Sequence, residues 1–382
     1  MRNVRVRNRV GVGLLDFESI DDMPADFYNH IVMSKFTRIF SIAYIIFLVM
    51  LSVYIVLDGF VIPHEMTAVT STEPSTVVSE IETVDPAEDS GISEEESEEI
   101  SEEEVAAREV PEETQEDLEE ESEEELPFTD GEVIQTENSY VDDSISVTVN
   151  TYRQYDTDIY VADIYVADLS HFLTAFAKDT YGRNITQKTS KLAAAKEAII
   201  AINGDYYGKR ESGYVAREGV LYRDTVYTDP TTGKPNEALV LYTDGTMEAV
   251  TEGEVEASEL MENGAWDIWS FGPALIEDHE IAVSVDEEVG KAMASNPRTA
   301  IVYISPHHYL FIVSDGRTSA SEGLSLYQLA SFIKINFDAP FAFNLDGGGS
   351  STMVFNGEFV NNPVATGSKT SERYVSDIVY IK

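Results

Sequence analysis

The sequence predicts an α+β fold: a mixed, largely antiparallel sheet with a few packed helices, preceded by one transmembrane helix and a disordered acidic linker. Three observations lead to this prediction. Short alternating segments separated by turn residues recur through the second half of the chain. One long uncharged run lies near the N-terminus, and a glutamate-rich stretch follows it. We therefore divide the chain into a tail (residues 1–38), a transmembrane helix (39–57), a linker (58–131) and a folded domain (132–382).

The uncharged run covers Ile39–Leu57, and its 19 residues can cross a hydrocarbon core of about 30 Å. The nearby cations all precede it: Arg2, Arg5, Arg7, Arg9, Lys35 and Arg38. No further cation follows until Arg108. This asymmetry predicts a single-pass cell-membrane protein with a cytoplasmic N-terminus and an extracytoplasmic domain. A cleaved signal peptide fits less well, because the run begins late and no small-residue cleavage site follows it.

The charge of the chain is −45 at pH 7, and about half of it lies in residues 80–125, which hold 24 acidic residues against one arginine. Self-repulsion and scarce apolar groups predict a disordered spacer that holds the domain off the membrane, in preference to a cation-binding tail. So negative a chain is not expected to bind nucleic acid. The absence of cysteine excludes disulfides, thiolate metal sites and cysteine nucleophiles.

Outside residues 341–355, eleven elements are predicted in the folded domain. Alternation predicts a strand at Ser144–Thr151, and a longer one at Asp158–Asp168, where Asp-Ile-Tyr-Val-Ala occurs twice. His171–Ala177 is predicted to be the hairpin partner of the longer strand. A helix at Ser190–Ala198 precedes a strand at Ile199–Ile202. The remaining elements are the hairpins Leu239–Tyr242 with Met247–Val250 and Thr299–Ile304 with Tyr309–Val313, a helix opened by the capping box Ser325-x-x-Gln328, and the strand Val375–Ile381.

The most informative stretch runs from Phe341 to Phe355. Two apolar segments, Phe341–Leu345 and Thr352–Phe355, are predicted strands. Between them stand Asp346, three glycines and two serines, and the second segment begins with a third hydroxyl side chain. A tight turn capped by a carboxylate is the simpler interpretation, but it does not need three glycines. Because glycines let a ligand approach backbone N–H groups, we interpret the loop as the floor of an active site for a polar or anionic ligand.

Five motifs in this part of the chain share an order with a known family. They are Asn203-Gly-Asp-Tyr-Tyr207, Phe271-Gly-Pro273, Asn296-Pro-Arg-Thr-Ala300, Ser314-Asp-Gly-Arg317 followed by Ser321-Glu-Gly323, and Asn344-Leu-Asp-Gly-Gly-Gly-Ser-Ser-Thr352. From about Tyr140 to the C-terminus the chain resembles the phosphodiester glycosidases. The resemblance implies an α+β fold and hydrolysis of a sugar-1-phosphodiester to a sugar and a phosphomonoester.

The resemblance also implies roles for individual residues. Asp346 and Asp205 would stand at the reacting centre, where a carboxylate can stabilise an oxocarbenium-like state, attack it or activate water. Arg298 and Arg317 would bind phosphate, and Glu322 would be a further acid or base. The other substrate-binding candidates are Asn203, Asp315, Asn344, Gly347, Gly348, Gly349, Ser350, Ser351 and Thr352.

Several of these residues, and two neighbouring pairs, also have a purely structural interpretation. Asp205 could form an Asx turn after Asn203-Gly204, and the arginines could pair with acidic neighbours in so acidic a domain. Glu322 precedes a predicted helix, so the helix N-terminus explains its charge equally well. His307 and His308 fit a hairpin tip better than a metal pair, and Tyr206 and Tyr207 could stack on a sugar or pack in the core.

The predicted function is therefore a membrane-anchored extracytoplasmic hydrolase acting on a sugar-phosphate glycan of the cell envelope or an exopolysaccharide. Two alternatives stay open: an envelope module that binds glycan phosphates without turnover, and a phosphatase-like hydrolase that acts at phosphorus. No cofactor is expected. A divalent cation bridging carboxylates and phosphate is compatible with the chemistry, but no ligand spacing in the sequence calls for one.

Overall fold

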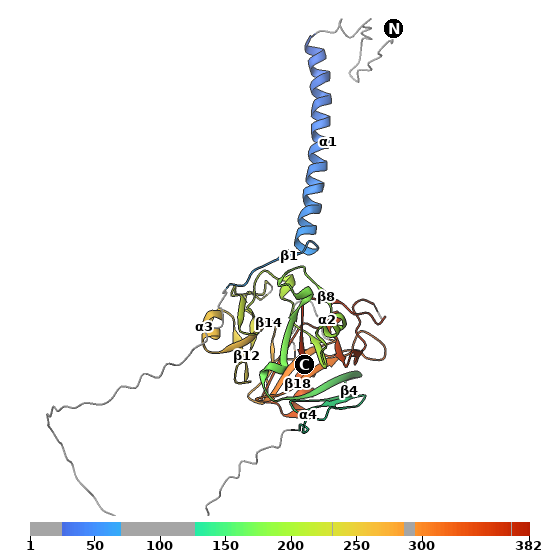
Figure 1. Cartoon of the computed structure of the whole chain (residues 1–382). Coiled ribbons are helices and arrows are strands. Elements are labelled where there is room, and N and C mark those ends of the chain that lie inside the picture. The colour runs from blue at the N-terminus through green and yellow to red at the C-terminus, as the bar shows by residue number, and fades with distance from the viewer. Residues whose placement is uncertain (1–24, 70–126, 231, 286–294, 368) are drawn as a thin grey trace, which may run out of the picture.

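The structure is a computed structural model that describes residues 25–69, 127–230, 232–285, 295–367 and 369–382 (Figure 1). The first 24 residues of the predicted tail and residues 70–126 of the predicted linker lie outside the described residues. In the described part, mostly antiparallel sheets and four helices form an α+β fold, as predicted. The named strands pair only in antiparallel fashion, and two isolated bridges, Glu252↔Val255 and Val364↔Ser371, are parallel.

The N-terminal helix α1 (Ala25–Phe60) projects from the domain (Figure 1). Its segment Ile39–Phe60 is 22 residues long, has a mean hydropathy of 2.7 and is not buried by the rest of the protein. By length and composition this segment could cross a membrane. The chain then forms β1 (His64–Glu65), which pairs with β7 (Gly182–Arg183). Residues 58–69, predicted to open the linker, thus lie on the domain.

The largest sheet has nine strands. In spatial order they are β16 (Glu280–Ile281), β15 (Ala274–Glu277), β19 (Phe341–Asn344), β17 (Thr299–Ser305), β18 (His308–Ser314), β5 (Thr157–Val166), β4 (Ile145–Gln154), β3 (Ser139–Val141) and β2 (Ile134–Gln135). The repeated pentapeptide lies in β5. Because five is odd, the two copies present opposite faces, so Ile159 and Ile164 lie in different hydrophobic clusters. Both faces of this strand are therefore buried.

Two five-stranded sheets complete the domain. One is ordered β21 (Glu358–Phe359), β20 (Met353–Phe355), β9 (Ile200–Asn203), β23 (Asp377–Ile381) and β6 (Phe172–Phe176). The other is ordered β11 (Val220–Arg223), β10 (Val215–Arg217), β14 (Ala265–Ser270), β12 (Glu237–Tyr242) and β13 (Met247–Thr251). β22 (Tyr374–Val375) pairs separately with β8 (Gln187–Lys188). Short 3-10 turns occur at Leu169–His171, Ala177–Asp179, Tyr207–Lys209 and Gly348–Ser350.

The main core lies where the three large sheets meet, and Phe172, Trp269 and Phe311 pack there edge to face. The opposite face of the nine-stranded sheet is covered by α4 (Leu326–Phe337), whose predicted capping box at Ser325 is confirmed. The helix α2 (Thr189–Lys196) covers β9 and β23. The short helix α3 (Ala257–Glu262) packs beside β14.

The predicted strands and the two predicted hairpins β12–β13 and β17–β18 are present, but one pairing was wrong. The segment at 171–177 was expected to pair with the strand at 158–168. Instead β6 pairs with the C-terminal strand β23. The reason is that β5 has no free edge, because β4 occupies one side of it and β18 the other.

Candidate active site

The glycine-rich loop passes from one sheet to another. β19 belongs to the nine-stranded sheet, and β20, which follows the loop, belongs to a five-stranded sheet beside β9. Asp346 therefore leaves the end of β19 close to Asp205, which follows β9. Both aspartates line one pocket of about 380 Å³. Its other lining residues are Thr186, Tyr206, Lys209, Ser350, Arg373, Tyr374, Val375 and Ser376.

Asp205 is buried and fixed by three protein groups. Its Oδ1 accepts a hydrogen bond from the Tyr207 amide at 2.8 Å, which is the Asx turn considered above. Its Oδ2 accepts from the Ser270 amide at 3.2 Å and from the Arg217 guanidinium at 3.3 Å. Such contacts fix the orientation of the carboxylate, so Asp205 supplies a rigid wall to the pocket.

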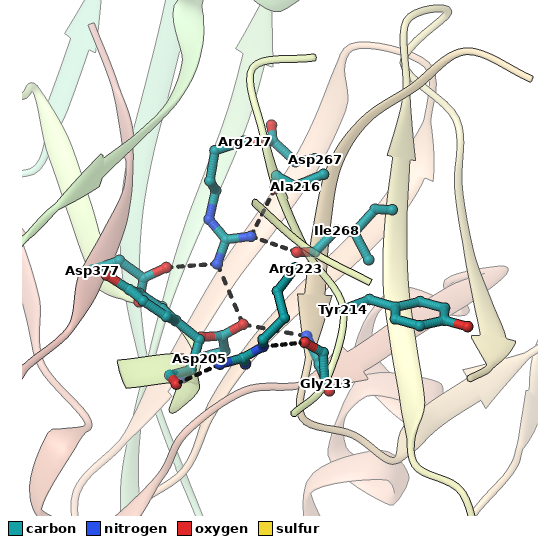
Figure 2. Close-up of polar contacts among 12 residues, drawn as sticks. Asp205, Gly213, Tyr214, Ala216, Arg217, Arg223, Asp267, Ile268 and Asp377 are labelled. Carbon is teal, nitrogen blue, oxygen red and sulfur yellow. Dashed lines mark hydrogen bonds and ion pairs between the residues drawn. The ribbon is translucent and has the colours of Figure 1, made fainter. Parts of the chain in front are cut away.

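Arg217 connects Asp205 to a second buried carboxylate (Figure 2). Its Nη2 lies 2.7 Å from the Asp377 Oδ2, its Nη1 donates to the backbone oxygens of Ala216 and Ile268, and its guanidinium lies 5.1 Å from the Trp269 ring centre. Burial would lower the pKa of Arg217, but the charges of Asp377 and Asp205 raise it. Burial and the neighbouring Asp205 charge raise the pKa of Asp377. The buried Arg217 thus forms ion pairs with two carboxylates, those of Asp205 and Asp377.

Asp346 differs from Asp205 in that its side chain is only partly covered. Its backbone oxygen accepts a 2.7 Å hydrogen bond from the side-chain amide of Asn203. Burial raises the pKa of Asp346 to about 6, against the opposing effects of the Ser350 hydroxyl and the charges of Arg373 and Arg210. Such a carboxylate is ionised at neutral pH and yet close to its pKa. It can stabilise positive charge, attack as a nucleophile or take a proton from water.

The three glycines are required by close neighbours. A Cβ added at Gly347 would lie 3.0 Å from the Pro297 oxygen. Gly348 has a φ of +64°, and a Cβ there would lie 2.7 Å from the Arg317 Nη2. At Gly349 a Cβ would lie 2.8 Å from the Ala365 Cα and 2.9 Å from the Arg373 Nε. The loop is glycine-rich because other backbone segments and two arginines approach it.

Cations surround the pocket of Asp346. Arg373 and Lys209 line it directly. Arg210 lies beside it, with its guanidinium 4.1 Å from the Tyr227 ring centre and 6.0 Å from that of Tyr206. Burial and the charge of Arg373 lower the pKa of Arg317, and Asp346 acts in the opposite sense. These cations can neutralise a phosphate group that enters the pocket.

Several predicted residues lie outside this pocket. Arg298 is buried, and its Nε donates to the Leu324 oxygen at 2.8 Å. The buried Asp315 accepts hydrogen bonds from Asn361, Asn362 and Tyr160. Asn344 donates to the Gly272 oxygen at 2.8 Å. Glu322 is exposed on its loop and does not line the pocket. These four residues are therefore not among those that line the pocket with Asp346, although Arg298 lies next to Gly347.

Other predicted residues act behind the pocket wall. The Asn203 side chain donates to Asp346 and Gly204, and its Oδ1 accepts from Thr299 and the Thr352 amide. It therefore positions the loop. Ser351 and Thr352 are fully buried, and their hydroxyl oxygens have no hydrogen-bond partner among the described residues. Of the three hydroxyl residues, only Ser350 lines the pocket.

Sequence reasoning missed Arg373, Lys209, Arg217 and Asp377 as parts of the site. Each stands at or beside the boundary of a short strand or turn and outside the five motifs. The available signal was the scarcity of cations in the acidic domain. Lys209 and Arg210 follow the Asn203–Tyr207 motif closely, and an argument from that proximity could have found them.

The C-terminal part of the chain is similar to known proteins. Residues 196–382 match the model of the phosphodiester glycosidase family. The chain is 31% identical over 186 residues to the SPbeta prophage-derived uncharacterized protein YomE of Bacillus subtilis, and 26% identical over 182 residues to the human N-acetylglucosamine-1-phosphodiester alpha-N-acetylglucosaminidase. These matches cover 48% and 45% of this chain, but only 28% and 34% of the relatives. The chain thus spans about a third or less of the proteins it resembles.

Two solved structures resemble the fold. The catalytic domain of the zebrafish N-acetylglucosamine-1-phosphodiester alpha-N-acetylglucosaminidase, auto-inhibited by its pro-peptide, has a TM-score of 0.47 and 20% identity, over 62% of this chain and 82% of that one. A hypothetical protein from Synechocystis has a TM-score of 0.44 and 13% identity, over 63% of each chain. The segment matched to the family model contains Asp205, Arg217, Asp346, Arg373 and Asp377.

Proposed function

We propose that this chain is a hydrolase that cleaves the bond between C1 of a sugar and a phosphodiester oxygen, because residues 196–382 match the model of the phosphodiester glycosidase family. The observation that carries the proposal is the pairing of Asp346 and Asp205 in one pocket with Arg373 and Lys209. Carboxylates suit the sugar cation that forms as the bond breaks, and cations suit the departing phosphate.

The reaction follows from these placements. The phosphate binds beside Arg373 and Lys209, which places the sugar C1 toward Asp346. As the bond from C1 to oxygen lengthens, the Asp346 carboxylate stabilises the positive charge on the sugar. The leaving phosphate is already an anion and needs little help from an acid. Asp205, held by Arg217, keeps the second wall of the pocket negative and rigid. No cofactor enters this scheme.

We also propose that α1 anchors the protein in a membrane, with the domain on the extracytoplasmic side. The apolar segment Ile39–Phe60 is long enough to span, and the cations near it stand on its N-terminal side. Substrates in that location would be sugar-phosphate glycans of the cell envelope or exopolysaccharides. Protease added to intact cells should then cut the acidic segment at 70–126. Complete protection of that segment would contradict this orientation.

The test of the chemistry uses the full chain in detergent with a sugar-1-phosphodiester in ¹⁸O-labelled water. Label in the sugar hydroxyl is the expected result, because water replaces phosphate at C1. Label in the released phosphate would instead favour attack at phosphorus. Saturable binding without turnover would favour a binding module. Asp346→Asn should bind the diester and lose turnover by about 10²- to 10⁴-fold, and unchanged turnover would remove Asp346 from the mechanism.

A further inference from the structure

We propose that the substrate is itself a membrane lipid: a phosphodiester that joins C1 of a sugar to an alcohol embedded in the bilayer. This inference rests on the proposed function and names the substrate class for the same pocket. It comes from the way in which the end of α1 is attached to the domain, a feature that plays no part in the chemistry described above.

The domain is fixed to the end of the helix. The side-chain amide of Asn184 lies 3.4, 3.3 and 3.2 Å from the backbone oxygens of Asp58, Gly59 and Ile62. β1 then pairs with β7, and the Met66 amide donates to the Tyr181 oxygen at 3.0 Å. These contacts leave no free length of chain between the helix and the domain. The domain is therefore held at the surface of the membrane that α1 crosses.

The pocket lies at this same attachment. Lys209 lines the pocket, and its ammonium group lies 3.4 Å from the Phe60 oxygen and 2.9 Å from the Asn184 Oδ1. A single lysine side chain therefore extends from the last residue of α1 to the pocket wall. The headgroup layer is roughly 5–7 Å thick on each side of the hydrocarbon core. The pocket wall is therefore one lysine side chain away from the end of α1, which in the proposed arrangement lies at the headgroup layer.

The residues around the pocket fit such a location. Tyr206 and Tyr374 both line it and are 37% and 60% exposed. Phe60 and Val61, at the attachment, are 72% and 60% exposed. Tyrosine is typical of the interface between lipid and water, where its ring lies among the chains and its hydroxyl in the headgroups. Two tyrosines at the pocket and two exposed apolar residues at the attachment are thus suited to a lipid surface.

The reaction balances without a co-reactant. Water forms a bond to C1, the bond from C1 to the phosphate oxygen breaks, and its electron pair remains on that oxygen. One proton of the water passes to solvent through the neighbouring carboxylate. The sugar leaves into water and the lipid phosphomonoester stays in the bilayer, so the two products separate.

The experiment uses the full chain in liposomes and two diesters with the same sugar phosphate. One diester carries a long-chain alcohol and lies in the same bilayer, and the other carries a methyl group and is soluble. At equal total concentration we expect the lipid diester to be hydrolysed at least tenfold faster. Hydrolysis of the soluble diester alone would overturn the lipid substrate and leave the proposed function intact. Hydrolysis of neither would overturn both.

Two variants test the attachment. Asn184→Gly removes the amide that holds the end of α1 and allows the positive φ found there. The second variant adds to Asn184→Gly a flexible Gly-Ser insertion of twelve residues between Ile62 and Pro63, which also separates α1 from β1. Both should lose the preference for the lipid diester and keep hydrolysing the soluble one, which also shows that they fold. The same insertion between Glu98 and Glu99 is the control and should change neither rate. An unchanged preference, or an equal loss of both activities in both variants, would overturn the inference.

Discussion

Asp346 is a carboxylate on which two opposing effects act. Burial disfavours its charge, whereas Arg373 and Arg210 favour it, and burial is the larger effect. The result is a pKa of about 6. Nearby Asp205 is held in one orientation by three direct hydrogen bonds to its carboxylate. The two aspartates therefore differ: Asp346 is close to its pKa at neutral pH, whereas the Asp205 carboxylate is held in one orientation.

The first prediction concerns the pH dependence of turnover. In the proposed mechanism Asp346 is ionised when it stabilises the sugar cation, so kcat/KM should fall about tenfold per pH unit below about pH 6. The measurement is kcat/KM for a soluble sugar-1-phosphodiester between pH 4.5 and 8. A profile that is flat through pH 6 would show that a different group controls the rate.

The second prediction concerns stability. The pKa of Asp346 is higher in the folded protein than its ordinary value of 3.8, so the folded state binds this proton more tightly than the unfolded state. Stability is therefore lost as the pH rises from about 4 to about 6, and the full penalty persists above that range. Asp346→Asn should have a higher Tm than the wild type at pH 7.5 and nearly the same Tm at pH 4. Equal Tm differences at both pH values would contradict this.

The third prediction concerns Arg217, which serves Asp205 and Asp377 from a buried position. Arg217→Met leaves both carboxylates without their cation and should cost about 3–5 kcal/mol in the free energy of unfolding at pH 7.5. The loss should shrink as the pH falls, because protonation removes the uncompensated charge. Urea denaturation measures both effects. The matched control is Arg153→Met, which breaks an exposed pair with Asp158 and should cost less than about 1 kcal/mol.

At the scale of elements, the glycine loop depends on both backbone freedom and close contact. Gly348 and Gly357 both have a positive φ, of +64° and +84°. A Cβ at Gly348 meets the Arg317 guanidinium, whereas a Cβ at Gly357 meets nothing within 4 Å. The two positions therefore separate the cost of the backbone from the cost of the contact.

The fourth prediction uses this pair. Gly348→Ala and Gly357→Ala should each lower the free energy of unfolding by about 1–2 kcal/mol, because alanine disfavours a left-handed backbone. Only Gly348→Ala should also lower kcat/KM, by about tenfold or more, because Arg317 and the loop beside Asp346 must shift. Equal kinetics for the two variants would show that this contact does not support the site.

The sequence predicts where the strands and helices lie better than it predicts which strands pair with each other. Periodicity and turn residues locate β12, β13, β17, β18 and α4, because each of these patterns is local. The partner of β6 could not be predicted, because it lies at the far end of the chain. For the same reason the loop motif points to Asp346, whereas Arg217 and Asp377 join the site only through the meeting of separate sheets.

For the whole molecule, the attachment of α1 to the domain determines how far the domain lies from the helix. The sequence predicts instead that the acidic linker sets this distance. Val69 donates its amide to the Leu221 oxygen at 2.9 Å, and Thr129 donates to the Asp142 oxygen at 2.8 Å. The residues on both sides of the acidic segment thus lie on the same domain. The acidic segment therefore does not set the distance between the helix and the domain.

If the acidic segment is cut, the two fragments should therefore stay associated, whereas a cut in a free linker would release the domain. The N-terminal fragment would keep β1 and its neighbours seated on the domain, in the manner of a two-chain protein whose halves stay associated after cleavage. Both fragments should remain with the lipid until a denaturant separates them. The denaturant concentration that releases them would measure the strength of a few short backbone contacts. Because these contacts hold the domain, the acidic segment could vary in length without moving the pocket.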